Sequence, residues 1–121
     1  MARKKLVIKL LAGSADPERV SQAFTVASTA IASGVDVSLW LASEASWFAL
    51  PRKAEEFTLP LAAPLHELRD GILAAGSITL CTQCAARRHI EEKDLIPGIT
   101  IKGSTAFVEE VTGPDVQALV Y

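Results

Sequence analysis

The sequence is poor in cysteine and in excess charge of either sign, and each shortage excludes a class of protein. Two cysteines in 121 residues are too few for a secreted disulfide scaffold. The 12 basic and 14 acidic residues give a formal net charge of -2, without the basic excess that a phosphate-reading nucleic-acid protein needs. No apolar run approaches the ~20 residues that span a bilayer. We therefore expect neither nucleic acid nor a membrane as a partner.

Aromatic residues are also scarce, at 6%, although half of the chain is apolar. The core must therefore be built from alanine and aliphatic side chains, and a disordered chain is excluded. The length fits a single domain over residues 1–121. A mean hydropathy of +0.29 is high for so small a protein. Together with Trp40, Trp47 and Phe48, it predicts apolar surface that a second copy of the chain would cover, with the rim near residues 43–50 at or beside the interface.

The N-terminus has the order of a signal peptide, because the basic residues 1–5 precede an apolar run over residues 6–12. Lys9 interrupts that run and leaves it shorter than a normal signal sequence. The pattern favours a first strand entered from a basic N-terminus. We therefore expect a cytoplasmic protein.

Apolar periodicity changes repeatedly between that of a strand and that of a helix. Asp16-Pro17 begins the first helix and Gly34 ends it, between two short branched apolar runs. The later signals are a short helix, a charged surface loop and a third helix before the next strand. The expected elements are strands at 6–11, 35–41, 77–81, 99–101 and 116–121, helices at 17–33, 43–50, 64–75, 82–90 and 104–111 (the last capped by Ser104), and a loop at 51–60.

This alternation predicts a three-layer α/β/α domain with a parallel five-stranded sheet. In such sheets, reactive groups gather at the carboxyl ends of the strands. Four segments occupy that edge here: residues 12–16, 42–48, 81–84 and 102–104.

The pair Cys81 and Cys84 is the most reactive feature of that edge. Cys81 ends a strand and precedes a helix, where the helix dipole lowers the pKa of a thiol. Cys84 lies one turn further on the same face. Arg88 shares this face and could add positive potential, and the polar neighbours Thr82 and Gln83 argue against an inert, buried Cys81.

Other interpretations of these residues stay open. Either cysteine could be an inert core residue. A closed zinc site needs four ligands, and His66 and His89 are poorly spaced to complete one, so we expect no metal and no cofactor. Trp47, with Phe48, could roof the thiol, form a contact between copies of the chain, or pack in the core.

The stretch from Ile78 to Ile90, with Asp94-Leu95-Ile96-Pro97-Gly98 after it, resembles the DsrE/DsrF-like family, which includes the TusD-type subunits of sulfur relays. The family's sulfur-accepting cysteine corresponds to Cys81. The position of Cys84 is alanine in TusD-like members and cysteine in stand-alone relatives, and His89 stands where the family usually has glycine. The resemblance implies the strand order 4-3-2-1-5, a trimeric or hexameric homo-oligomer, and donor and acceptor proteins for sulfur.

Three functions follow from these patterns. In the first, the protein is a sulfurtransferase-type carrier: Cys81 accepts sulfane sulfur as a persulfide and passes it on, and Cys84 could resolve the persulfide. In the second, the two cysteines cycle as a thiol–disulfide redox pair. In the third, the chain is a non-catalytic oligomeric binding module. A carrier requires Cys81 alone, a redox pair requires both cysteines, and a binding module requires neither.

Overall fold

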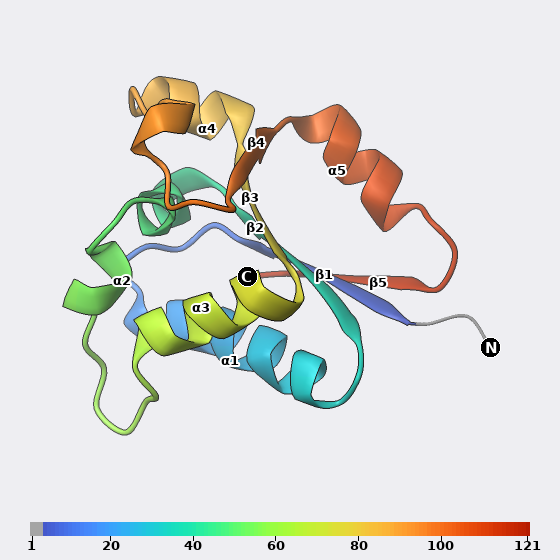
Figure 1. The fold of residues 1–121 in the computed structure, drawn as a ribbon, viewed down its shortest axis with the longest axis horizontal. Coiled ribbons are helices and arrows are strands. Elements are labelled where there is room, and N and C mark those ends of the chain that lie inside the picture. Colours follow the sequence, from blue (N-terminus) through green and yellow to red (C-terminus); the bar gives the residue numbers. More distant parts are fainter. Residues whose placement is uncertain (1–3) are drawn as a thin grey trace.

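The computed structural model describes residues 4–121, which fold around one five-stranded sheet (Figure 1). Residues 1–3, part of the basic segment discussed above, lie outside the described residues. The elements in chain order are β1 (Lys5–Leu10), α1 (Pro17–Ala32), β2 (Asp36–Leu41), η1 (Ser43–Ala49), α2 (Lys53–Glu56), α3 (Leu65–Ala75), β3 (Ser77–Cys81), α4 (Thr82–Arg87), η2 (Glu92–Asp94), β4 (Thr100–Lys102), α5 (Ser104–Val111) and β5 (Val116–Val120).

The sheet is parallel throughout, with strand order β4-β3-β2-β1-β5. The predicted α/β architecture is therefore confirmed, as is the strand order that the family resemblance implied. Lys9, Trp40 and Thr79 pair in register across the three central strands, and Cys81 pairs with Lys102 on the edge strand β4. Because side chains alternate along a strand, these five residues share one face of the sheet.

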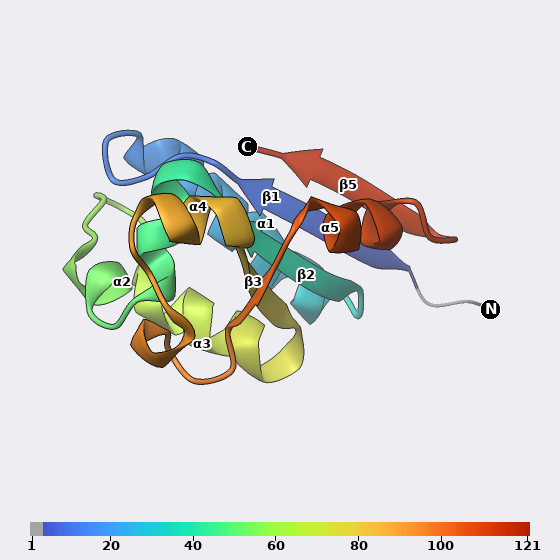
Figure 2. The same ribbon diagram turned by 90° about the horizontal axis from the view of Figure 1, so that it is seen from above.

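Helices cover the two faces unequally. Helices α1 and α3 lie side by side under one face, and Ala85 of α4 packs into the same core, whereas α5 lies above the other face (Figures 1 and 2). The last connection, from β4 to β5, crosses back over the sheet, which places α5 opposite α1. The outcome is three layers, with a thick helical layer on one side and a thin one on the other.

The main core lies between the sheet and helices α1 and α3. In α1, Val20, Phe24 and Ala27 recur at helical spacing and are buried against the sheet. Burying each large apolar side chain stabilises the fold by about 1.5–3 kcal/mol. The strand residues that meet the helices are all 0–1% exposed: Ile8, Leu10, Leu39, Leu41, Ile78 and Leu80.

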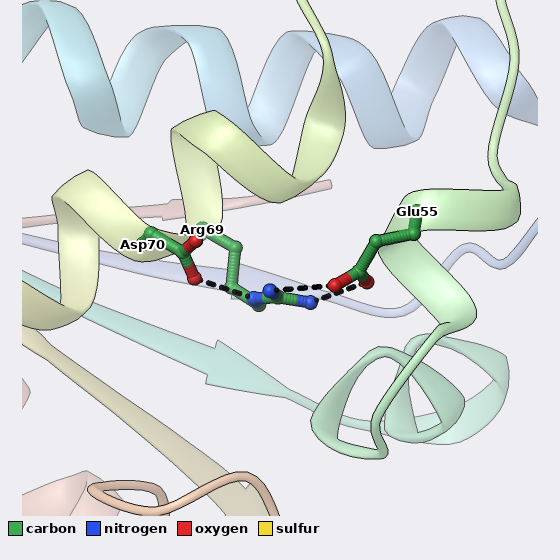
Figure 3. Close-up of polar contacts among 3 residues, drawn as sticks. All are labelled: Glu55, Arg69 and Asp70. Atoms are coloured by element: carbon green, nitrogen blue, oxygen red, sulfur yellow. Dashed lines mark hydrogen bonds and ion pairs between the residues drawn. The ribbon is translucent and has the colours of Figure 1, made fainter.

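A buried arginine joins α2 to α3 (Figure 3). The Arg69 side chain is 7% exposed and donates to both oxygens of Glu55, at 2.8 and 3.1 Å, and to Asp70 at 3.0 Å. The hydrogen bonds from Arg69 lower the pKa of Glu55 to about 2. A forked guanidinium satisfies two oxygens at once, so this pair fixes α2 against α3.

The structure corrects three local predictions. Residues 51–60 are not all loop, because Lys53–Glu56 form the helix α2, held by the buried Ala54 and by the ion pair of Glu55. Helix α5 is capped by Gly103, and Ser104 is its first residue. Helix α4 stops at Arg87 instead of continuing to residue 90, because His89 adopts a left-handed conformation with φ 54°.

The predicted source of exposed apolar surface is also wrong in part. Trp40 is 1% exposed and Phe48 is 2% exposed, so a single chain already buries both. Trp40 packs edge-on against Phe107 of α5, and Phe48 packs edge-on against Phe24 of α1. The large hydrophobic side chains that do reach solvent include Leu11, Leu61, Val108 and Val120.

Candidate functional site

Cys81 lies at the carboxyl edge of the sheet, at the junction of β3 and α4. It is the last residue of β3 and the N-cap of α4, with extended backbone angles (φ -63°, ψ 128°). Its side chain is partly exposed, in contrast to the fully buried Leu80 before it. The strand-to-helix turn therefore presents this thiol to solvent on a rigid support.

The surroundings of Cys81 favour its thiolate. Burial raises the pKa of the Cys81 thiol, but the backbone N–H groups of Cys84 and Gln83, the thiol of Cys84 and the charge of Lys9 outweigh it and lower the pKa below its usual 9.0. These N–H groups belong to the first turn of α4, where no acceptor within the helix is available to them. A partly exposed thiol with a depressed pKa is a nucleophile.

Cys84 is held differently. It is buried, 9% exposed, and its sulfur accepts a hydrogen bond of 3.1 Å from the backbone N–H of Ser43. Ser43 lies directly after β2 in a left-handed conformation with φ 50°, which turns its N–H toward the cysteine. Both cysteines are free thiols in the structure, and the nearby Cys84 thiol helps to lower the pKa of Cys81.

Arg88 is engaged with a carboxylate, which sequence reasoning did not foresee. Its guanidinium contacts Oε2 of Glu44 at 2.7 Å and the carbonyl oxygen of Cys84 at 3.2 Å, and it lies 6.0 Å from the ring of Trp47. The hydrogen bond from Arg88 lowers the pKa of Glu44. The charge of Arg88 is thus neutralised locally, and this cluster joins α4 to η1.

Lys9 is the cation that acts on Cys81, and sequence reasoning missed it. Its ammonium lies 4.0 Å above the ring of Phe107. The available signal was a single charge inside an apolar strand. Its significance depended on register, because Lys9 faces the side of the sheet that carries Cys81.

The other predicted site residues lie around this edge. Thr82 and Gln83 form the exposed first turn of α4, where Gln83 contributes its N–H. Trp47 is half-buried and lines a hollow of about 380 Å³ between the loop after β1 and η1, together with Glu44. Neither cysteine lines that hollow.

Metal-binding and membrane-spanning features were sought over residues 4–121. No group of three or more histidine, cysteine or acidic side chains in that range could hold a metal ion. His89 is exposed and His66 is half-buried on a separate helix. Within the same range, no helix combines the length and apolarity needed to cross a bilayer.

The fold and site together define an α/β protein with one activated cysteine at the carboxyl edge of a parallel sheet. A family-profile comparison matches residues 4–113 to the DsrE/DsrF-like family, and the chain belongs to that family. A search of curated proteins found no match.

Two solved structures share the fold over nearly the full length. The YchN protein from E. coli superposes with a TM-score of 0.80 at 20% identity, covering 98% of this chain and 99% of that chain. The protein of unknown function MTH1491 from Methanobacterium thermoautotrophicum superposes with a TM-score of 0.74 at 11% identity, with coverage of 98% and 99%. Identities this low carry the fold and nothing more specific.

Proposed function

We propose that this protein is a sulfur carrier in which Cys81 accepts sulfane sulfur as a persulfide and passes it to an acceptor protein. The observation that carries the proposal is the depressed pKa of a partly exposed thiol at a strand end. Sulfur transfer needs a nucleophilic thiolate and an accessible rim, and the site supplies both. Membership of the DsrE/DsrF-like family supports the same assignment.

In this proposal, Cys84 tunes Cys81 before it does anything else. Its thiol helps to lower the pKa of Cys81, while Ser43 N–H holds the Cys84 sulfur in place. Cys84 could also attack the persulfide, which forms the Cys81–Cys84 disulfide and releases the outer sulfur as hydrogen sulfide. Burial of Cys84 makes that second reaction slow.

The test is intact mass after incubation with a persulfide donor, with and without reductant. Wild-type protein should gain about 32 Da, the mass of one sulfur atom, and should lose it on reduction. Cys81→Ser should abolish the adduct. Cys84→Ser should keep it, with an equal or longer lifetime. Uptake of sulfur by both variants alike, or faster alkylation of Cys84 than of Cys81, would refute the carrier assignment.

A thiol–disulfide redox pair is the second candidate, favoured by the proximity of the two free thiols at the start of α4. In that case, an oxidant should remove about 2 Da from the wild-type mass as the disulfide forms. Neither single variant should show this loss of mass. A binding module would retain its partners in both variants. The pair of serine variants therefore separates all three functions.

A homo-oligomer is part of the proposal. The apolar rim at residues 43–50 is smaller than expected because Phe48 is buried. The edge strand β5 instead carries no charged residue, and Val120 on it is 63% exposed. An uncharged, apolar sheet edge favours contact with a second copy. A single 12.9 kDa species in sedimentation at micromolar concentration would contradict this assembly.

We place the carrier in the cytoplasm as a further part of the proposal, because a relay thiol must stay reduced between transfers. Donor and acceptor proteins would approach the exposed side of Cys81. Mass spectrometry of Cys81 alkylated in intact cells would test the compartment, since a fully oxidised thiol would speak against it.

A further inference from the structure

Two lysines share the sheet face of Cys81. Lys102 is the register partner of Cys81 on the neighbouring strand β4. Lys9 on β1 lies in the next row of the same face, with Trp40 between it and β3. The cysteine is therefore flanked by a cation on each side along the sheet.

Neither charge is neutralised by an ion pair within residues 4–121. Lys9 is half-buried, and its ammonium is held 4.0 Å over the ring of Phe107, an interaction that orients the charge without cancelling it. Lys102 is exposed. Other cations near the sheet differ: Lys5 pairs with Glu110 at 3.7 Å, and Arg88 pairs with Glu44.

A small side chain lies on this face between the strands that carry the two lysines. Ala42 continues the alternation of β2 onto this face at the level of Cys81, and it is buried. Glu110, the half-buried carboxylate of α5, accepts from the indole N–H of Trp40 at 3.2 Å and pairs with Lys5 toward the amino end of β1. The neighbourhood of the sulfur is thus cationic, and Lys9 and Cys81 are both recessed enough to favour a small ligand.

We propose, building on the sulfur-carrier function, that Lys9 and Lys102 recognise small doubly charged sulfane-sulfur donors and that Cys81 takes sulfur from them directly. Thiosulfate and inorganic polysulfide share this chemistry. Phe107 is a positioning residue for Lys9. Uncompensated cations beside a nucleophile raise the local concentration of anions and offset their repulsion by the thiolate.

The transfer is balanced without a further reactant. The Cys81 thiolate attacks the outer sulfur of the donor and forms a new S–S bond. The donor's own S–S bond breaks, and its electron pair leaves with sulfite, or with a polysulfide one atom shorter. Total charge is -3 before and after, as one thiolate and one dianion give one persulfide anion and one dianion. The two lysines face the departing dianion as well as the arriving one.

A reagent pair of matched reactivity measures the proposed selectivity without using sulfur transfer. In a Cys84→Ser background, the rate of Cys81 alkylation by anionic iodoacetate is divided by the rate with neutral iodoacetamide. A change in thiolate fraction cancels in this ratio, because both reagents react with the same thiolate. We expect Lys9→Met and Lys102→Met each to lower the ratio about threefold or more.

Lys93→Met is the matched control, since Lys93 is exposed on η2 and pairs with Glu91 at 3.2 Å. Its ratio should not change. Equal ratios in the Cys84→Ser parent and in both test variants would overturn the recognition of anions, whatever the protein's function.

Sulfur loading by thiosulfate and by polysulfide then tests the substrate class. We expect loading by at least one of them, slowed by Lys9→Met and Lys102→Met but not by Lys93→Met. Loading only by a persulfidated protein would overturn this inference and leave the carrier function intact. Absence of loading from every donor would overturn the carrier function itself.

Discussion

The two faces of the sheet solve different problems. On the face under α1 and α3, strands β1 to β4 present an apolar layer that includes Ile8, Leu39 and Leu80. On the face under α5, strands β1 to β4 carry polar side chains, among them Lys9, Ser38 and Thr79, and α5 contributes no fully buried residue. The first face supplies stability, and the second holds a nucleophile and its charges close to solvent.

The face under α5 also leaves a buried polar group without a hydrogen-bond partner among the described residues. Ser38 lies buried in it, and its hydroxyl has no hydrogen-bond partner within residues 4–121. Trp40 is anchored from above only, by the ring of Phe107 and the carboxylate of Glu110. Buried polar groups without partners destabilise a fold. The face under α5 is therefore less stable than the other face, but it leaves the site accessible.

The largest expected effect comes from truncating one phenylalanine on each face. Phe24→Ala should cost about 3–5 kcal/mol in the free energy of unfolding, because Phe24 is 1% exposed among rigid neighbours. Phe107→Ala should cost about 1–2 kcal/mol, because α5 is half-buried. Urea titration measures both.

The order of the two variants should reverse when the alkylation rate of Cys81 is measured instead of stability. Phe107→Ala should slow alkylation of Cys81 at neutral pH, since Lys9 loses its support, whereas folded Phe24→Ala should alkylate normally. Equal losses of stability, with no change in alkylation, would show that the two faces do not divide these roles.

Sequence reasoning found the core face more completely than the site. The strands that feed it are short branched runs between Gly and Pro signals, so their existence, type and order followed from local pattern and family resemblance. Cys81 followed from its place between a strand and a helix. Lys9 did not, because its effect depends on a register between strands about 70 residues apart.

For Arg88, the sequence predicted the position of the side chain but not its ion-pair partner. Helical spacing placed it correctly beside Cys84, but Glu44, 44 residues earlier, takes its charge. Likewise, Trp40 looked available for an interface until Phe107, 67 positions away in the sequence, covered it. Local periodicity predicts which face a side chain takes, and distant partners decide what it does there.

The second prediction concerns the anchor of the thick face. Glu55→Ala removes the bidentate partner of a nearly buried guanidinium and should cost about 1 kcal/mol, because Glu55 is 44% exposed and Asp70 remains as a partner. The neighbouring Glu56 is exposed, so Glu56→Ala is the matched control and should change unfolding by less than about 0.5 kcal/mol. Identical urea midpoints for the two variants would show that the ion pair of Glu55 with Arg69 does not stabilise the fold.

The third prediction is the pH range in which that anchor is lost. The folded pKa of Glu55 is about 2 and its ordinary value is 4.5, so the carboxylate stabilises the fold fully above pH 4.5. The contribution should decline as pH falls from 4.5 toward 2. Because Glu55 is 44% exposed, solvent screening keeps it small. Glu55→Ala should therefore show a flatter loss of stability across this range than wild type, which acid titration at fixed urea detects.

The smallest expected effect on stability concerns the C-terminal ends of helices α1 and α4. In α1, Gly34 N–H bonds to Ile31 and Val35 N–H to Ala30, with Gly34 at φ 82°. Helix α4 ends with the same two-bond motif. Its left-handed position is occupied by His89, at φ 54°. A side chain in this conformation costs about 1–2 kcal/mol that glycine avoids in large part.

His89→Gly should therefore stabilise the protein by up to about 1 kcal/mol, and Gly34→Ala should destabilise it by a similar amount. No atom lies within 4 Å of a Cβ added at Gly34, so its cost would come from the backbone alone. His89→Ala keeps a Cβ and should leave stability near that of wild type, which separates backbone strain from loss of the imidazole. If His89→Gly destabilises the protein while His89→Ala does not, the left-handed turn at His89 is not strained. The end of α4 would then carry no more backbone strain than the end of α1.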